Sequence, residues 1–328
     1  MTRNNNKQKP FFWIPLPKEV PREKPVWHDR FIKERCTGKA ILVVTVSSEY
    51  LFVGSGAYEH NNKNFWMSFF QANGKICIPG TSLKGAIRSI AEAISSSCVL
   101  QRRWDKEQRR RGEEVSEDQK ACRNINNGLC PACRIFGAIG FRGRVSFSDA
   151  LSQDEVKKRK VTEIVKIGSL FGPQKYQSSR KFYQVGSASF STDLEPEENY
   201  QCLEVVPKET KFRTTLYFEN MAEDELGLVF AALGWDSENG QVKPVFTPKI
   251  GGAKPRCFGA VRFGLGRISF LHLPSWNLQP LEKNETLRFV ACCIEKAKKS
   301  GLIQIDAWEK LKEGFKAKNN FSCPRDVY

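Results

Sequence analysis

The alternation of apolar and polar positions divides most of the chain into segments of strand and helix character. Short runs rich in β-branched residues predict strands, and apolar residues three and four apart predict amphipathic helices. In chain order these segments are a strand at 40–46, a helix at 82–97, strands at 144–147 and 211–218, a helix at 223–233 and a strand within 257–271. This βαββαβ order predicts an α+β fold with a ferredoxin-like core, the pattern that RNA-recognition domains share.

Regions outside this core predict additions to it. Prolines near the start of the chain exclude a long helix there, and two amphipathic patterns near its end predict two helices. A polar, Lys-rich stretch in the middle predicts a long hairpin or a protruding loop. We therefore divide the chain into an extended arm at 1–38, a core domain at 39–275 with insertions at 98–140 and about 165–205, and a helical extension at 276–328.

The charge balance indicates a polyanionic partner. The 328 residues include 52 Lys and Arg against 36 Asp and Glu, which gives a net charge of +16. Because such an excess costs self-repulsion, we expect nucleic acid as the first choice of partner and an anionic membrane surface as the second. No run of 18 apolar residues and no signal peptide are present. We therefore expect a cytoplasmic protein whose 11 cysteines are mostly reduced thiols or metal ligands.

The segment 76–94, ICIPGTSLKGAIRSIAEAI, predicts an anion site at the start of a helix. A Pro-Gly turn precedes the helix, and the hydroxyl of Thr81 or Ser82 is expected to cap it. Lys84 and Arg88 then lie near the positive end of the helix, where folding alone does not favour cations. Free N–H groups together with added cations suit a phosphate. The alternative is that both cations lie on a solvated outer face.

Three further segments combine cations with glycine or aromatic residues. In KIGGAKPRCFG, two glycines allow a close backbone approach and an anion nest, although a hairpin loop with solvated cations is the alternative. An Arg-Gly-Arg turn precedes one strand, where a solvated turn is the alternative. Elsewhere cations interleave with aromatic residues, a pattern that suits single-stranded nucleic acid or a disordered basic loop. The candidate RNA-binding residues are Lys249, Gly251, Gly252, Lys254 and Arg256, then Arg142 and Arg144, then Lys175, Arg180 and Lys181.

Four cysteines predict a structural zinc site. Cys122, Cys130 and Cys133 form a C-x7-C-x2-C pattern, in which the CPAC turn directs two thiolates toward one ion. A tetrahedral site needs a fourth ligand, for which we choose Cys98 at the end of the preceding helix, with a histidine from elsewhere as the second choice. The alternatives are buried free thiols or a CxxC redox pair, which prefers a thioredoxin-like context that we do not find here.

Catalytic groups are sparse in this sequence. The chain has three histidines, and none of the nucleophile-elbow, zincin or paired-carboxylate patterns stands out. Glu59 and His60 lie in an Asn-rich segment and are weak candidates for a base or a metal ligand. The alternative, which we favour, is a solvated flexible loop.

Four motifs in order make the chain resemble a known family. IPGTSLKGAIR, CPACRIFG, GRVSFSDA and GGAKPRCFGAVRF are similar to segments of the RAMP superfamily of CRISPR effector proteins, and most closely of backbone subunits of type III complexes. The resemblance implies a ferredoxin-like core with a protruding thumb, which stacks with other RAMP subunits and a large subunit along a CRISPR RNA. It also implies that the helix after position 82 and the late glycine loop contact the guide, that the thumb shapes the duplex with target RNA, and that the cysteines hold zinc.

The chain departs from this family at the position of the catalytic acid. Target-cleaving members carry an aspartate between the first strand and the IPG turn, and the segment 49–79 has none. We therefore favour an RNA-binding backbone subunit that does not cut RNA. One alternative is a Mg²⁺-dependent endoribonuclease for target RNA or precursor CRISPR RNA, in which Glu59 or His60 replaces the aspartate. Another is a standalone basic RNA-binding protein.

Overall fold

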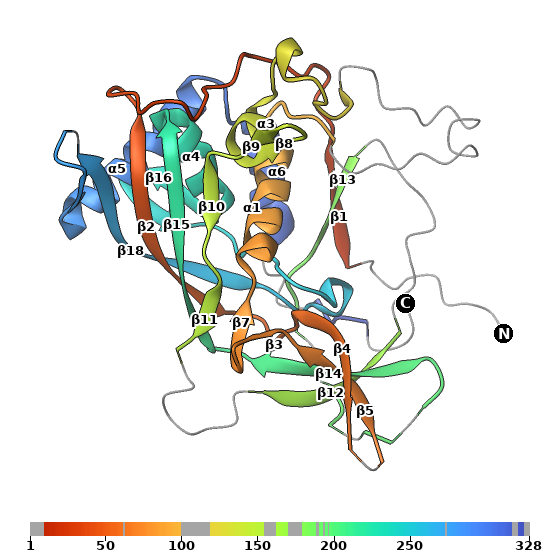
Figure 1. Ribbon diagram of the computed structural model, residues 1–328. Coiled ribbons are helices and arrows are strands. Elements are labelled where there is room, and N and C mark those ends of the chain that lie inside the picture. The colour runs from red at the N-terminus through yellow and green to blue at the C-terminus, as the bar shows by residue number, and fades with distance from the viewer. Residues whose placement is uncertain are drawn as a thin grey trace.

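The computed structural model describes most of the chain (Figure 1). The described residues are 10–61, 63–99, 119–153, 162–169, 179–187, 190–192, 194–195, 197–272, 274–316 and 321–324. Among the residues singled out from the sequence as candidate sites, Lys175 lies outside these ranges.

An antiparallel sheet of eight strands forms the centre of the molecule, in the order β19-β18-β2-β15-β11-β7-β6, with β10 also paired to β15. Helix α1 (Gly80–Ile94) follows the β2 to β7 region, and α4 (Glu223–Ala232) connects β15 to β18. The strand bounds are β2 (Cys36–Val46), β6 (Gln71–Ala72), β7 (Lys75–Ile78), β10 (Val145–Phe147), β11 (Ala150–Ser152), β15 (Lys211–Met221), β18 (Val261–His272) and β19 (Asn277–Pro280). The α+β class is confirmed, and the order of β2, α1, β10 and β11, β15, α4 and β18 agrees with the predicted βαββαβ pattern.

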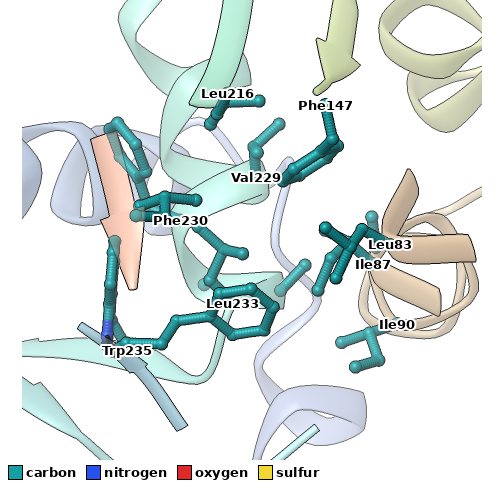
Figure 2. Packing of buried hydrophobic residues seen from close by; sticks show 14 of the residues in the cluster. Leu83, Ile87, Ile90, Phe147, Leu216, Val229, Phe230, Leu233 and Trp235 are labelled. Carbon is teal, nitrogen blue, oxygen red and sulfur yellow. Dashed lines mark hydrogen bonds between the residues drawn. The ribbon is translucent and has the colours of Figure 1, made fainter. Parts of the chain in front are cut away.

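Alternating side chains give the sheet one covered face. Along β2, Ala40, Leu42 and Val44 are fully buried, whereas the residues between them are partly exposed. Because successive side chains of a strand point to opposite faces, the buried set defines the face that the helices cover. Figure 2 shows apolar side chains of α1, including Leu83, directed toward Phe147 and toward the side chains of α4.

A second sheet lies at one end of the first and contains the segment predicted to be a flexible loop. Its strands pair in the order β12-β14-β5-β4, with β3 also paired to β14. Glu59 and His60 lie in β4, which forms a hairpin with β5, so the loop prediction was wrong. Every residue of β4 is exposed, and such a strand lacks the buried alternate positions that sequence patterns detect. The strand bounds are β3 (Tyr50–Leu51), β4 (Gly54–His60), β5 (Phe65–Phe69), β12 (Glu163–Gly168) and β14 (Tyr200–Pro207).

The N-terminal segment pairs with a strand that lies in the chain between β12 and β14 of the second sheet. Strand β1 (Phe11–Pro15) is antiparallel to β13 (Ser179–Tyr183), and Phe12 contacts the rings of Phe182 and Phe315. Phe315 ends α6 (Ile305–Phe315), which follows α5 (Lys283–Lys299). The segment that was expected to be an extended arm therefore docks on its own chain.

Smaller elements complete the described chain. These are α3 (Pro131–Phe136), the hairpin of β8 (Gly137–Ala138) and β9 (Phe141–Arg142), the hairpin of β16 (Trp235–Glu238) and β17 (Gln241–Pro244), and 3-10 turns at Ile125–Asn127 and Lys254–Arg256. A disulfide joins Cys257 to Cys323, whose Cα atoms lie 6.0 Å apart, so this pair departs from the expectation of reduced thiols. Chain folding, and not sequence spacing, brings these two cysteines within bonding range. In the described part of the chain, every helix falls short of the length and apolar character needed to cross a bilayer.

Candidate functional site

The four predicted cysteines converge on one point beyond the end of α1. Cys98 follows α1, Cys130 precedes α3 and Cys133 lies within it, and all four Sγ atoms lie within 4.8 Å of one another. The Cys98 Sγ lies 3.5 Å from that of Cys130 and 3.6 Å from that of Cys133. Four sulfurs at about 2.3 Å from a tetrahedral zinc ion are separated by about 3.8 Å. The cluster therefore fits a metal ion of this kind, and the choice of Cys98 over a histidine agrees with the geometry.

The four cysteines are buried, and hydrogen bonds to the Cys122 sulfur favour its thiolate form. All four cysteines are buried, and the N–H of Cys130 donates to the Cys122 Sγ at 3.3 Å. Hydrogen bonds from the thiols of Cys130, Cys133 and Cys98 lower the pKa of Cys122. Among the described residues, this is the one group of three or more His, Cys, Asp or Glu side chains close enough to share an ion. A soft, sulfur-rich site of this type favours zinc over magnesium.

Two arginines that were predicted to contact RNA connect α1 to the cysteine cluster. Arg88 donates to Glu92 at 2.8 Å, to the Gly137 carbonyl at 2.9 Å and to the Cys133 Sγ at 3.3 Å. Arg180 donates to Glu92 at 2.9 Å and to the Cys98 carbonyl at 2.8 Å. Glu92 is buried, so the two guanidinium groups neutralise a carboxylate within the protein.

The Arg-Gly-Arg turn divides its two arginines between solvent and the interior. Arg142 is largely exposed and pairs with Glu219 at 2.8 Å. Arg144 is buried, forms an ion pair with Glu225 and donates to the Asn220 carbonyl at 2.7 Å. Burial alone would raise the pKa of Glu225. The hydrogen bond and the positive charge of Arg144 outweigh burial and lower this pKa below its usual value.

Lys84 differs from these arginines because the described residues supply no counterion to it. It is half-buried and has no hydrogen-bond or ion-pair partner among the residues that the structure describes. Burial lowers the pKa of Lys84, and the positive charges of Arg88 and Arg142 lower it further. A Cβ atom at Gly143 would lie 2.8 Å from the Lys84 Nζ, so this glycine gives the ammonium group room.

The first turn of α1 is occupied by an acid from another part of the chain. The helix begins at Gly80, whose N–H donates to the Asp149 Oδ1 at 2.8 Å, and neither Thr81 nor Ser82 caps it. The predicted hydroxyl cap was therefore wrong, because both hydroxyls lie inside the first turn. The positive N-terminal end of a helix favours an anion, and at α1 this anion is the carboxylate of Asp149. Ser82 stays a half-buried residue beside it.

Three lysines gather around a small cavity on the other side of α1. The cavity has a volume of about 130 Å³ and lies between α1, β13 and the glycine loop, where Lys181, Lys249 and Lys254 line it. No carboxylate from the described residues lines the cavity. Lys249 is buried and donates to the Lys254 carbonyl at 3.3 Å. Burial, followed by the charge of Lys254, lowers the pKa of Lys249 to about 7.

The glycine loop that carries two of these lysines is fixed by contacts within the protein. Gly251 has a φ of +74°, and a Cβ there would lie 2.0 Å from the Phe52 carbonyl oxygen. Gly252 donates its N–H to that same oxygen at 2.8 Å. Arg256 is fully buried and donates to the carbonyls of Gly168 and Pro324. In this structure the two glycines and Arg256 therefore shape the loop that presents the lysines.

The candidate catalytic residues lie on β4, away from the cysteine cluster and the lysine cavity. Glu59 and His60 are exposed on β4, opposite Trp66 and Phe65 of β5. Neither has a hydrogen-bond or ion-pair partner within the described ranges. The hairpin brings no further carboxylate to them among these residues.

A comparison with known families accounts for this combination of motifs. A model of the RAMP superfamily matches residues 44–262, which is more than half of the chain. The chain belongs to the RAMP superfamily of CRISPR-associated proteins. A search of curated proteins gave no match. The matched range of this RAMP protein runs from β2 into β18, so it includes α1, the cysteine cluster and all three cavity lysines.

The acids of the site are the residues that sequence reasoning missed. Glu92, Glu225 and Asp149 decide which cations and N–H groups are already engaged. The spacing of Arg88 and Glu92, four residues apart on a helix, was a signal for one of these pairs. The partnership of Asp149 with Gly80 bridges segments 69 residues apart, so no local pattern could have found it.

Proposed function

We propose that this RAMP protein is a backbone subunit of a type III CRISPR effector complex, which holds a CRISPR RNA by its phosphates. In this proposal it stacks with other RAMP subunits and a large subunit, and shapes the duplex that the guide forms with target RNA. The cavity of Lys181, Lys249 and Lys254 is the observation that carries the proposal. Family membership supports the choice of RNA over other polyanions.

The cavity suits a phosphate group on physical grounds. Its cations converge where the described residues supply no lining carboxylate. A guide sequence varies, so a protein that holds it must bind the backbone and not the bases. Lys84 adds a further cation on α1 that has no partner among the described residues.

Salt-dependent RNA binding tests this proposal. The full chain is titrated against fluorescein-labelled single-stranded RNA of mixed sequence at several salt concentrations, and anisotropy reports binding. We expect Lys181→Ala/Lys254→Ala to weaken binding for every sequence and to reduce the slope of log K against log salt by about 1.4, or about 0.7 for each lost phosphate contact. Lys283→Ala/Lys299→Ala, on exposed positions of α5, is the charge-matched control. An unchanged slope in the cavity variant would remove the cavity from the RNA site.

The identity of the RNA needs a separate measurement. RNA that co-purifies with the chain from its native cells is sequenced, and we expect repeat-derived guides. For the contribution of α1 to RNA binding, Lys84→Ala is a cleaner test than any substitution of Arg88, because Arg88 also contacts Cys133 of the cysteine cluster. Co-purification of unrelated RNAs, or of none, with a stable monomer would instead indicate a standalone RNA-binding protein.

A further inference from the structure

The face of the main sheet that the helices leave uncovered carries exposed cations. Along β15, Lys211, Arg213 and Tyr217 are exposed between buried neighbours. Strand pairing places Val43 of β2 and Leu151 of β11 on either side of Arg213. These residues are neighbours on one face across three strands, and Figure 1 shows β15 in front of α4.

Three cations of this face have no side-chain partner among the described residues, whereas two nearby acids do. Arg213, Lys39 and Lys75 have no hydrogen-bond or ion-pair partner in the described part of the chain. Glu209 forms an ion pair with an arginine of β18 at 3.2 Å, and Asp149 accepts the first N–H of α1. Asp149 also lines the groove and keeps its negative charge, but the three cations outnumber it, so the net charge of these residues is positive.

An open groove lies within this surface. Its volume is about 810 Å³, and Lys75, Leu151, Arg213 and Thr215 are among the residues that line it. Ligand sites in proteins commonly occupy about 300–1,000 Å³, so the groove has room for a nucleotide. The guanidinium of Arg213 and the ammonium of Lys75 supply positive charge to this groove from two different strands.

An aromatic side chain stands on the same face beyond the groove. Tyr217 is 47% exposed, and strand pairing places Lys39 directly beside it. Four residues of extended chain separate Tyr217 from Arg213, which is about 13 Å. Cations and an exposed ring at such spacing are the two components of single-strand recognition, in which phosphates pair with charge and bases stack.

We propose that this open face binds a segment of single-stranded RNA, with Arg213 and Lys75 contacting phosphates at the groove and Tyr217 stacking on a base. The choice of RNA rests on the proposed function, but the surface is separate from the lysine cavity, which lies against α1 on the covered side. A second copy of the chain suits this face poorly, because the face and the whole chain are both positively charged.

Affinity for a uridine 15-mer measures the contribution of the face. Loss of one stacked base corresponds to about 5- to 150-fold weaker binding, which we expect for Tyr217→Ala, whereas Tyr217→Phe retains the wild-type affinity. We expect Arg213→Ala/Lys75→Ala to weaken binding and to reduce its salt dependence. Leu287→Ala/Arg288→Ala, an exposed pair on α5, is the control, and thermal unfolding checks that each variant is folded.

Photocrosslinking separates this inference from the proposed function. The full chain is irradiated with 4-thiouridine RNA, and the crosslinked peptides are identified by mass spectrometry. We expect crosslinks within β15 in the wild type and in Lys181→Ala/Lys254→Ala. Crosslinks confined to α1 and the glycine loop would overturn the inference and leave the proposed function intact, and no crosslinks anywhere would overturn both.

A protein partner for the face is also open to measurement. Light scattering without RNA reports the oligomeric state of the full chain and of Tyr217→Ala. We expect both to have the same mass. A wild-type oligomer that Tyr217→Ala dissociates would assign the face to a second copy and overturn the inference.

Discussion

Two groups of cations on either side of α1 have opposite surroundings. Toward the cysteine cluster, Arg88 and Arg180 share the buried carboxylate of Glu92 and donate to backbone carbonyls. Toward the glycine loop, Lys249 and Lys254 line a cavity that receives no carboxylate from the described residues. The first group is engaged by acids and carbonyls of the fold, whereas the described residues bring no carboxylate to the cavity of the second.

This difference shows that cations of one basic segment can have different surroundings: some are paired inside the fold and others are not. A guanidinium has five donors in a fixed plane, so a buried arginine can satisfy a carboxylate and several carbonyls at once. A lysine ammonium is a compact charge whose proton becomes less stable on burial. The segments selected for RNA binding thus supply internal arginines as well as lysines such as Lys84 and Lys249, which form no ion pair with the described residues.

Of the changes that separate the two regions, substitution of the clustered cysteines should have the largest effect on stability. Metal affinity of a structural site is folding free energy, about 10 kcal/mol or more in small zinc domains. We expect Cys130→Ser/Cys133→Ser to lose its zinc, measured by mass spectrometry of the metal, and to unfold at a much lower temperature. Cys292→Ser, at an exposed position of α5, is the control. Equal zinc content in the two variants would contradict the assignment of the cluster.

The Arg-Gly-Arg turn offers the next largest effect, with its own matched control. Removing one partner of a buried ion pair costs about 3–5 kcal/mol, which we expect for Arg144→Ala because Glu225 is then left buried without Arg144. The exposed Arg142→Ala should cost about 1 kcal/mol or less. Denaturant unfolding measures both. Similar losses in the two variants would show that burial does not distinguish these arginines.

The smallest expected effect is the pH dependence of stability and of RNA affinity that results from the titration of Lys249. Its pKa falls from 10.5 to about 7 on folding, so between these values the unfolded chain binds the additional proton. The free energy of unfolding should therefore rise with pH above 7, by at most about 1.4 kcal/mol per pH unit. RNA affinity should fall over the same range as the cavity loses charge. Lys249→Met should flatten both trends, which unfolding curves and anisotropy at pH 7 and pH 9 measure.

The cysteine site shows how far local patterns extend. The CPAC turn and the end of the preceding helix predicted the four cysteines that converge in the structure, because spacing within a short insertion constrains the geometry. The main strands and helices were predicted for a similar reason, since their apolar periodicity reflects burial directly. The exposed β4 strand was missed because it has no buried face.

The sequence by itself determined the α+β class, the members of the cysteine cluster and the excess of positive charge. Composition, spacing and periodicity are properties of neighbouring residues, and these features depend on nothing else. Tertiary structure alone decided that Arg180 meets Glu92, that Arg144 meets Glu225 and that the Gly80 N–H meets Asp149. An ion pair is decided by distance in space, and folding brings together residues as far apart as Arg144 and Glu225, which are 81 positions apart in the chain.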